Sequence, residues 1–167
     1  REAARTLHSL SRAYQEGIED LTYEVIAVEN GSPPDSLLGE EMVRSFGPEF
    51  RYIDLGEDAT PTPATALNHG IRASSGRAVA LMVDGAHVLS PGVLRHASTA
   101  LRSHDRAVVA VQPWYLGPGQ QGEAMRDGYD QAEEDALLDR VGWPTHGYGL
   151  FEIAHFQGDR DWLDGLW

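Results

Sequence analysis

The sequence contains no cysteine, only half as many basic as acidic residues, and no long hydrophobic run. The lack of cysteine excludes disulfides, thiolate catalysis and cysteine zinc sites, and it fits a reducing compartment, so we expect a cytoplasmic location. The 13 Lys and Arg against 26 Asp and Glu give a net charge of −13. This balance argues against nucleic acid as a partner, because no basic surface is available for phosphates. We expect no membrane span in this segment, since a span needs roughly 18 apolar residues.

The length and composition are those of one globular domain. The chain has 167 residues, of which 41% are hydrophobic and 23% are charged, an ordinary composition for a folded protein. It begins at Arg1 inside an amphipathic pattern and stops at Trp167 inside an aromatic-rich stretch. We therefore expect a piece of a longer protein, truncated at both ends.

Helical and strand-like patterns alternate up to about residue 112. Apolar, β-branched runs predict strands, and apolar spacings of three and four predict helices. The expected strands are 22–28, 50–54, 78–83 and 107–112, and the expected helices are 2–18, 35–46, 66–74 and 90–101. Strands joined by helix-length connections predict an α/β fold with a Rossmann-like, doubly wound, mainly parallel sheet. Beyond Pro113 we expect an acidic helix over 121–140, and residues 141–167 show no clear period.

Polar side chains follow several of the predicted strands. Glu29 and Asn30 follow the first, Asp84 and then His87 follow the third, and Gln112 follows the fourth. Because ligands of open α/β sheets bind at the carboxyl ends of the strands, we expect Glu29, Asp84 and Gln112 to share one edge. Carboxylates and amides there suit the base and ribose of a nucleotide, or a divalent cation that bridges a diphosphate.

Three short segments occur in a familiar order and spacing: Val28-Glu29-Asn30-Gly31-Ser32, the stretch from Ala66 to Gly76, and the stretch from Val83 to Gly92. Together they resemble motifs of glycosyltransferase family 2. The resemblance covers roughly residues 1–112 and implies the GT-A fold, a nucleotide-sugar-binding domain. The domain would span 1–167, with the nucleotide-sugar-binding half over 1–112 and the start of the acceptor-side region over 113–167.

The resemblance also implies site residues. Glu29 and Asn30 would contact the nucleotide base, Asn68 would lie near the ribose, and Asp84 would contact the ribose and a divalent metal. Each has a structural alternative. Asp84 would cap a turn at a strand end, Glu29 and Asn30 would stabilise their own turn, and Asn68 would fasten its helix to the sheet.

At two positions the sequence lacks a side chain that the family commonly has for binding the metal or the phosphates. Ala86 stands where the family usually has a metal-binding Asp, and Leu67 stands where Arg or Lys is common. A divalent metal, Mn²⁺ or Mg²⁺, is therefore expected to bind more weakly than usual for the family. His87 is a second candidate ligand beside Asp84, and a site with a histidine favours Mn²⁺ over Mg²⁺. A histidine beside a turn with no ligand role is the alternative.

The function implied by the resemblance is sugar transfer from a nucleotide-diphosphate sugar donor to an acceptor hydroxyl, with inversion. The carboxylate base is expected outside this segment, so the segment alone is expected to be inactive. The alternative is a non-catalytic glycosyltransferase-like module that binds a nucleotide or a protein, which Ala86 and Leu67 favour.

Two groups of residues in the last third of the chain have a plain structural explanation. The acidic stretch 123–139 is expected to be a solvated helix face rather than a metal cluster. The late aromatic residues are expected to be core residues rather than sugar contacts: Trp114, Trp143, Tyr148, Phe151, Trp162 and Trp167.

Overall fold

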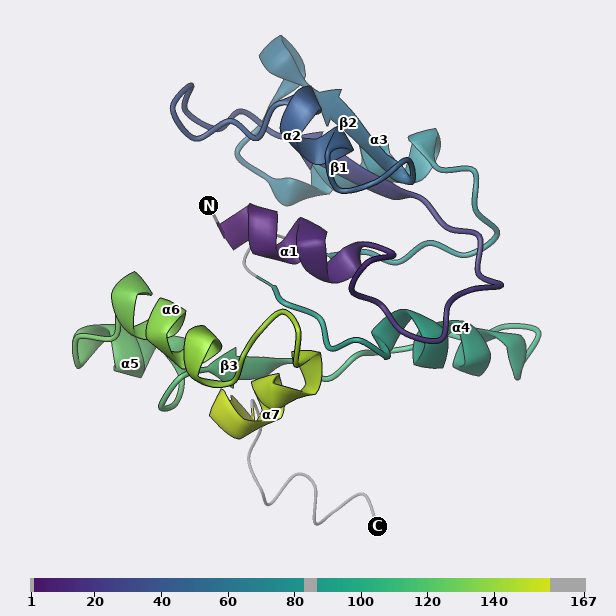
Figure 1. Ribbon diagram of the computed structural model, residues 1–167. Helices are drawn as coiled ribbons and strands as arrows, with labels where there is room; N and C mark the ends of the chain where they lie inside the picture. The colour runs from purple at the N-terminus through teal and green to yellow at the C-terminus, as the bar shows by residue number, and fades with distance from the viewer. Residues whose placement is uncertain (1, 83–86, 157–167) are drawn as a thin grey trace. The chain divides into compact units, whose positions relative to one another are not determined.

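The computed structural model describes residues 2–82 and 87–156, and the chain divides after Leu89 into two units (Figure 1). The first unit contains α1 (Glu2–Leu10), β1 (Val25–Glu29), α2 (Glu40–Arg44), β2 (Phe50–Asp54), the 3-10 turn η1 (Gly56–Asp58) and α3 (Pro63–Ala73). The second contains α4 (Val93–Arg102), β3 (Trp114–Leu116), α5 (Gln121–Arg126), α6 (Gln131–Arg140), η2 (Gly147–Gly149), α7 (Leu150–Ile153) and β4 (Ala154–Phe156). Both units mix helices and strands.

The first unit is built on a parallel pair of strands, β1 and β2, as the sequence predicts. Their register pairs Val25 with Phe50 and Glu29 with Asp54. Two parallel strands need a connection that crosses over the sheet, and α2 lies in that connection. The carboxyl ends of β1 and β2 therefore lie side by side, with Glu29 and Asp54 opposite each other.

Helix α3 packs against β1 and begins at a well-defined start signal. Thr62 is the N-cap, its side-chain oxygen accepts the N–H of Ala64 at 3.3 Å, and Pro63 occupies the first helical position. Such a proline loses nothing, because its missing N–H would have no helical partner there. A Cβ on Gly70 would lie 3.4 Å from Cγ2 of Val28, an ordinary van der Waals contact, so this part of the helix lies directly against the strand.

The core of the first unit joins residues from two helices and a strand. Leu7, Val43 and Phe50 are buried together. Partly buried side chains surround them: Leu10, Val25, Ala27, Leu38, Phe46 and Tyr52. The ring centroids of Phe46 and Phe50 are 5.8 Å apart, a tilted aromatic contact that adds to the area buried. This core anchors β2 between α1 and α2.

Two expected strands are absent from the part of the chain that the structure describes. The described residues 78–82 and the segment 107–112 are coil. Their apolar side chains are largely exposed, with Val108 at 99%. A β-branched composition gives only a preference, whereas a strand also needs a neighbour to hydrogen-bond with. The sheet of the first unit accordingly has two strands in the described residues, and the doubly wound arrangement is not seen in them.

Several helix boundaries differ from the predictions, and at the end of α1 a side chain competes for a backbone carbonyl. The helix expected over 2–18 ends at Leu10, where the Ser11 hydroxyl donates to the His8 carbonyl at 2.7 Å. The helix expected from Asp35 begins at Glu40, and the one expected from Ser90 begins at Val93.

The acidic stretch 121–140 forms two helices rather than one. Gly128, at φ +99°, ends α5, and the Asp130 carboxylate caps α6 by accepting the N–H of Glu133 at 3.1 Å. Glycine takes this left-handed conformation without steric cost, and an aspartate N-cap satisfies an otherwise unpaired helical N–H. Most of its acidic side chains are exposed, as expected of a solvated face.

The second unit contains an antiparallel pair that the aperiodic sequence did not predict. β3 pairs with β4, and Trp114 lies opposite Phe156. The Trp114 ring contacts the rings of Phe151 and Phe156 at centroid distances of 5.5 and 5.3 Å.

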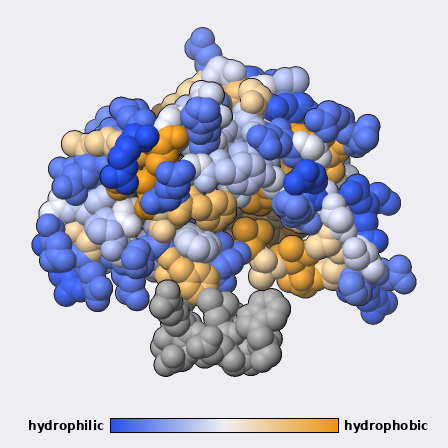
Figure 2. Space-filling view, turned by 60° about the horizontal axis from the view of Figure 1, so that its bottom comes forward, coloured by the Kyte–Doolittle hydropathy of each residue, from blue (hydrophilic) through white to orange (hydrophobic). Residues whose placement is uncertain are grey.

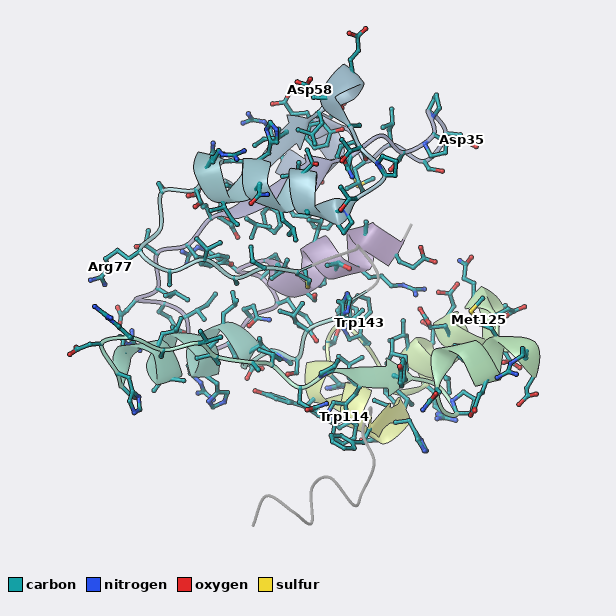
Figure 3. The ribbon with its side chains drawn as sticks, turned by 180° about the vertical axis from the view of Figure 1, so that it is seen from behind. Asp35, Asp58, Arg77, Trp114, Met125 and Trp143 are labelled. Carbon is teal, nitrogen blue, oxygen red and sulfur yellow. The ribbon has the colours of Figure 1, made fainter. Side chains whose placement is uncertain are left out.

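The prediction that the late aromatic residues are core residues is wrong for Trp114, Tyr148 and Phe151. They are 43–50% exposed. Trp114, labelled in Figure 3, lies on the short β3–β4 pair, whereas a Cβ on Gly92, just before α4, would lie 2.7 Å from the Tyr148 hydroxyl. Trp162 and Trp167 lie outside the described residues.

A charged clamp joins the start of β1 to the end of α3 and gives the first unit a predictable acid sensitivity. Glu24 accepts the hydroxyl and the backbone N–H of Ser75, both at 2.7 Å, and pairs with Arg51. The Ser75 hydroxyl, the Ser75 N–H and then Arg51 lower the pKa of Glu24 from 4.5 to about 2. The ionised form is therefore favoured by folding. The stability that it contributes is present above pH 4.5 and is lost as the pH falls toward 2.

We expect Glu24→Gln to remove this part of the acid dependence. Between pH 4.5 and 2 the midpoint of urea unfolding should fall less steeply in the variant than in the unaltered protein. The matched control is Glu16→Gln, which changes an exposed glutamate without such partners among the described residues. If the midpoint of urea unfolding fell equally steeply with pH in Glu24→Gln and in the unaltered protein, Glu24 would not contribute to the acid sensitivity.

Candidate functional site

The candidate site lies at the carboxyl ends of β1 and β2. Glu29 is the last residue of β1 and only 6% exposed. Its Oε1 accepts the N–H of Ser32 at 2.9 Å, and its backbone carbonyl accepts the N–H of Leu55 at 3.1 Å. The carboxylate therefore organises the turn that follows β1, which is the structural alternative stated for it above. Its predicted contact with a nucleotide base stays a prediction.

Asn30 joins the loop after β1 to the loop that precedes α3. Its Oδ1 accepts the N–H of Thr60 at 3.1 Å, and its Nδ2 donates to the carbonyls of Thr60 at 2.8 Å and Thr62 at 3.3 Å. An amide group has two N–H donors, and both are used here. This geometry makes Asn30 a positioning residue for the two loops. The predicted contact of Asn30 with a base also stays a prediction.

The two loops approach so closely that only glycine fits beside Asn30. Gly31 has φ +86°, and a Cβ at this position would lie 2.9 Å from the Cβ of Ala59. The left-handed conformation favours glycine, and the short distance leaves no room for a side chain. The Asn-Gly pair in the first motif is therefore explained by the packing of one loop on the other.

The second loop is fixed in turn to the N-terminus of α3. The hydroxyl of Thr60 donates to Oγ1 of Thr65 at 2.8 Å, and Thr62 caps the helix. Sequence reasoning missed Thr60 and Thr62. A signal was present, because a threonine directly before a proline is a typical helix start. The partnership of Thr60 with Asn30, 30 residues earlier, left no signal in the sequence.

The electrostatic character of this edge is acidic. Glu29, Asp54, Glu57 and Asp58 all lie on β1, β2 or the η1 turn, and Figure 3 shows Asp58 pointing outward. Burial raises the pKa of Tyr52, the charges of Asp54 and Glu29 raise it further, and a hydrogen bond from the Gly39 N–H lowers it. A doubly negative diphosphate would need a cation or basic groups to approach this edge.

The described residues do not by themselves make a metal centre. Within residues 2–82 and 87–156, no three His, Cys, Asp or Glu side chains gather closely enough to hold a metal ion. Glu29 and Asp54 each use one carboxylate oxygen to accept a backbone N–H, from Ser32 and Gly56. Of the two predicted metal ligands, His87 is exposed and Asp84 lies outside the described residues. We therefore derive no step through a metal.

The remaining predicted residues are placed as follows. Asn68 is exposed on α3, and none of the hydrogen bonds found in the described residues involves its side chain. This is unlike the fastening role considered as its alternative. Gln112 is exposed in the second unit, where its Nε2 donates to the carbonyl of Pro113 at 3.3 Å. The structure thus brings together Glu29, Asn30 and the loop 59–62, and a shared edge with Asp84 and Gln112 stays a prediction.

Comparison with known protein families identifies the family to which the chain belongs. The family model described as "Glycosyl transferase family 2" matches residues 2–153 of the 167. The chain belongs to this family. The family match extends beyond residue 112, where the motif resemblance ends, and reaches α7 of the second unit. No curated protein and no solved structure matches the chain.

Membership in glycosyl transferase family 2 places the chain among proteins that transfer sugars, in general terms. In the described part of the chain, no helix is both long and apolar enough to cross a membrane.

Proposed function

We propose that the complete protein transfers a sugar from a nucleotide-diphosphate sugar to an acceptor hydroxyl, with inversion at the sugar carbon. The observation that carries the proposal is the family match over residues 2–153, together with a polar strand-end edge in the first unit. A doubly wound sheet in the complete protein is part of the proposal, and β1 and β2 would supply two of its parallel strands.

In this proposal, different residues at the edge would contact different parts of the donor. Glu29 and Asn30 hold the two loops, and the turn after β1 would receive the base. Asp84 would contact the ribose and, with His87, a divalent cation. Such a cation would supply positive charge for the leaving diphosphate. Because Ala86 removes one anionic ligand, we propose that a metal binds appreciably only together with the nucleotide.

The reaction itself is a direct displacement. The acceptor oxygen forms a bond to the anomeric carbon as the bond from that carbon to the diphosphate oxygen breaks. The electron pair of the broken bond leaves with the nucleoside diphosphate, and the acceptor proton passes to a carboxylate base. Fixing donor and acceptor in line contributes to the rate because it removes their freedom of motion.

Calorimetric titration of the complete protein with nucleoside diphosphates, with and without Mn²⁺, tests the proposal. We expect binding that Asp84→Ala weakens about tenfold or more, the loss of one charge-assisted contact. His87→Ala should change only the part that depends on Mn²⁺. Asp20→Ala, an exposed carboxylate before β1, is the control and should bind like the unaltered protein. No binding at millimolar nucleotide would overturn the assignment of the donor site.

The second candidate function is the non-catalytic module, favoured by Ala86 and Leu67. It predicts nucleotide binding by the complete protein without release of nucleoside diphosphate from any nucleotide sugar supplied with acceptors. A coupled assay for the released diphosphate separates the two functions.

A further inference from the structure

The second unit contains a cleft of about 510 Å³ beside α6. It is lined by Tyr129 and residues of α6, and by Gly117 and residues from the end of α7 and the start of β4. Its volume lies within the roughly 300–1,000 Å³ that is usual for small-molecule sites. We propose that this cleft binds the hydroxyl-rich ring of a saccharide.

Charged side chains line the cleft without neutralising one another. Glu133 and Arg140 come from α6, and Glu152 and His155 come from α7 and β4. In the part of the chain that the structure describes, these four side chains have no hydrogen bond or ion pair with protein groups. Their donors and acceptors are therefore available to a ligand.

Apolar and aromatic groups also line the cleft. Among them are Leu137 and the buried Ile153. The ring of Tyr129 lines the cleft as well and lies against Gly117. A Cβ on Gly117 would be 2.6 Å from Cζ of Tyr129, and Gly117 has φ +92°. The left-handed conformation favours glycine at this position, and the absence of a side chain leaves room for the Tyr129 ring against the backbone.

This combination matches the two-sided chemistry of a sugar ring. The C–H face of a sugar packs on apolar and aromatic surfaces, while each hydroxyl both donates and accepts hydrogen bonds. Carboxylates at 133 and 152 accept from hydroxyls, and the Arg140 guanidinium donates to them. A diphosphate fits poorly, because two carboxylates with a single guanidinium would repel it. The cleft therefore suits an uncharged saccharide rather than the nucleotide part of a donor.

In a sugar-transferring enzyme, a saccharide held here without a nucleotide would be the acceptor. That assignment rests on the proposed function, whereas binding of the saccharide does not. The two are tested by different ligands: methyl glycosides for the cleft and nucleoside diphosphates for the strand-end edge.

The experiment is saturation-transfer NMR of the complete protein with methyl glycosides of glucose, galactose, mannose and N-acetylglucosamine. At least one should bind with a dissociation constant on the order of millimolar, as expected for one small ring on an open site. Arg140→Met and Glu152→Gln should each weaken this binding about tenfold, the effect of one lost charge-assisted hydrogen bond. Both residues are exposed, so both variants should fold, which circular dichroism checks.

The matched control is Arg126→Met, which removes an exposed arginine of α5 that does not line the cleft. It should bind the glycoside like the unaltered protein. The inference is overturned if no glycoside binds, if both cleft variants bind normally, or if glycine, a small zwitterion, binds in place of the glycosides. In the unaltered protein, nucleotide binding without any glycoside binding refutes the cleft alone. Glycoside binding by the unaltered protein without any nucleotide binding refutes the donor site alone.

Discussion

Replacing Phe50 by alanine is expected to lower the free energy of unfolding of the first unit by about 3–5 kcal/mol. Phe50 is 2% exposed and shares its buried cluster with Leu7 and Val43. Truncation to alanine removes the apolar area and leaves a cavity, because β2 is held in place by its pairing with β1. Native-state hydrogen exchange of the backbone amides in β1 measures this loss within the first unit.

The control for this substitution is Phe151→Ala, which truncates the same side chain at a half-exposed position in the second unit. It should leave exchange in β1 unchanged, because surface positions contribute little. If Phe50→Ala also left exchange in β1 unchanged, the cluster of α1, α2 and β2 would not be the core of this unit.

Replacing Asn30 by alanine is expected to cost about 1–3 kcal/mol of stability, the penalty for leaving partly buried hydrogen-bonding groups unpaired. It removes three hydrogen bonds with the loop at Thr60 and Thr62. Because the turn after β1 would then lose its fixed position, we also expect nucleotide affinity to fall about tenfold or more. Chemical unfolding and calorimetric titration measure the two effects.

Asn30→Asp separates positioning from direct contact. The aspartate can still accept the N–H of Thr60, but it cannot donate to the two carbonyls, so part of the stability should be lost. Asn68→Ala serves as the control for stability only, since Asn68 is exposed on α3. A fall in nucleotide affinity without any fall in stability for Asn30→Ala would contradict the positioning role.

The sequence predicted the elements whose signals are local. The strands β1 and β2 were recognised from apolar, β-branched runs, and their connection implied the parallel pairing that is found. The polar edge followed from the position of Glu29 at the end of a strand. The strands expected over 78–83 and 107–112 are not found in the described residues 78–82 and 107–112. Composition expresses only a preference, while strand formation depends on a neighbouring backbone.

The features of the two sites that the sequence did not predict depend on contacts between residues far apart in the sequence. Nothing near Asn30 indicates that its amide is used by Thr60. The cleft of the second unit is assembled from segments near residues 117, 129–140 and 152–155, and the sequence after 140 has no period to place them. Only the three-dimensional arrangement shows that Arg140 and Glu152 line one surface.

The coil segments at 78–82 and 107–111 are expected to favour self-association of the protein at high concentration. Both are short, uncharged and rich in alanine and valine, and most of their apolar side chains are exposed. Figure 2 shows hydrophobic patches, in orange, on one face of the protein. Such stretches outside any sheet are the ones through which separate molecules join into intermolecular β-structure. Arg77 precedes the first, and Arg106 and Pro113 flank the second. A charge or a proline in these places interrupts the growth of stacked strands, so we expect these three residues to limit self-association.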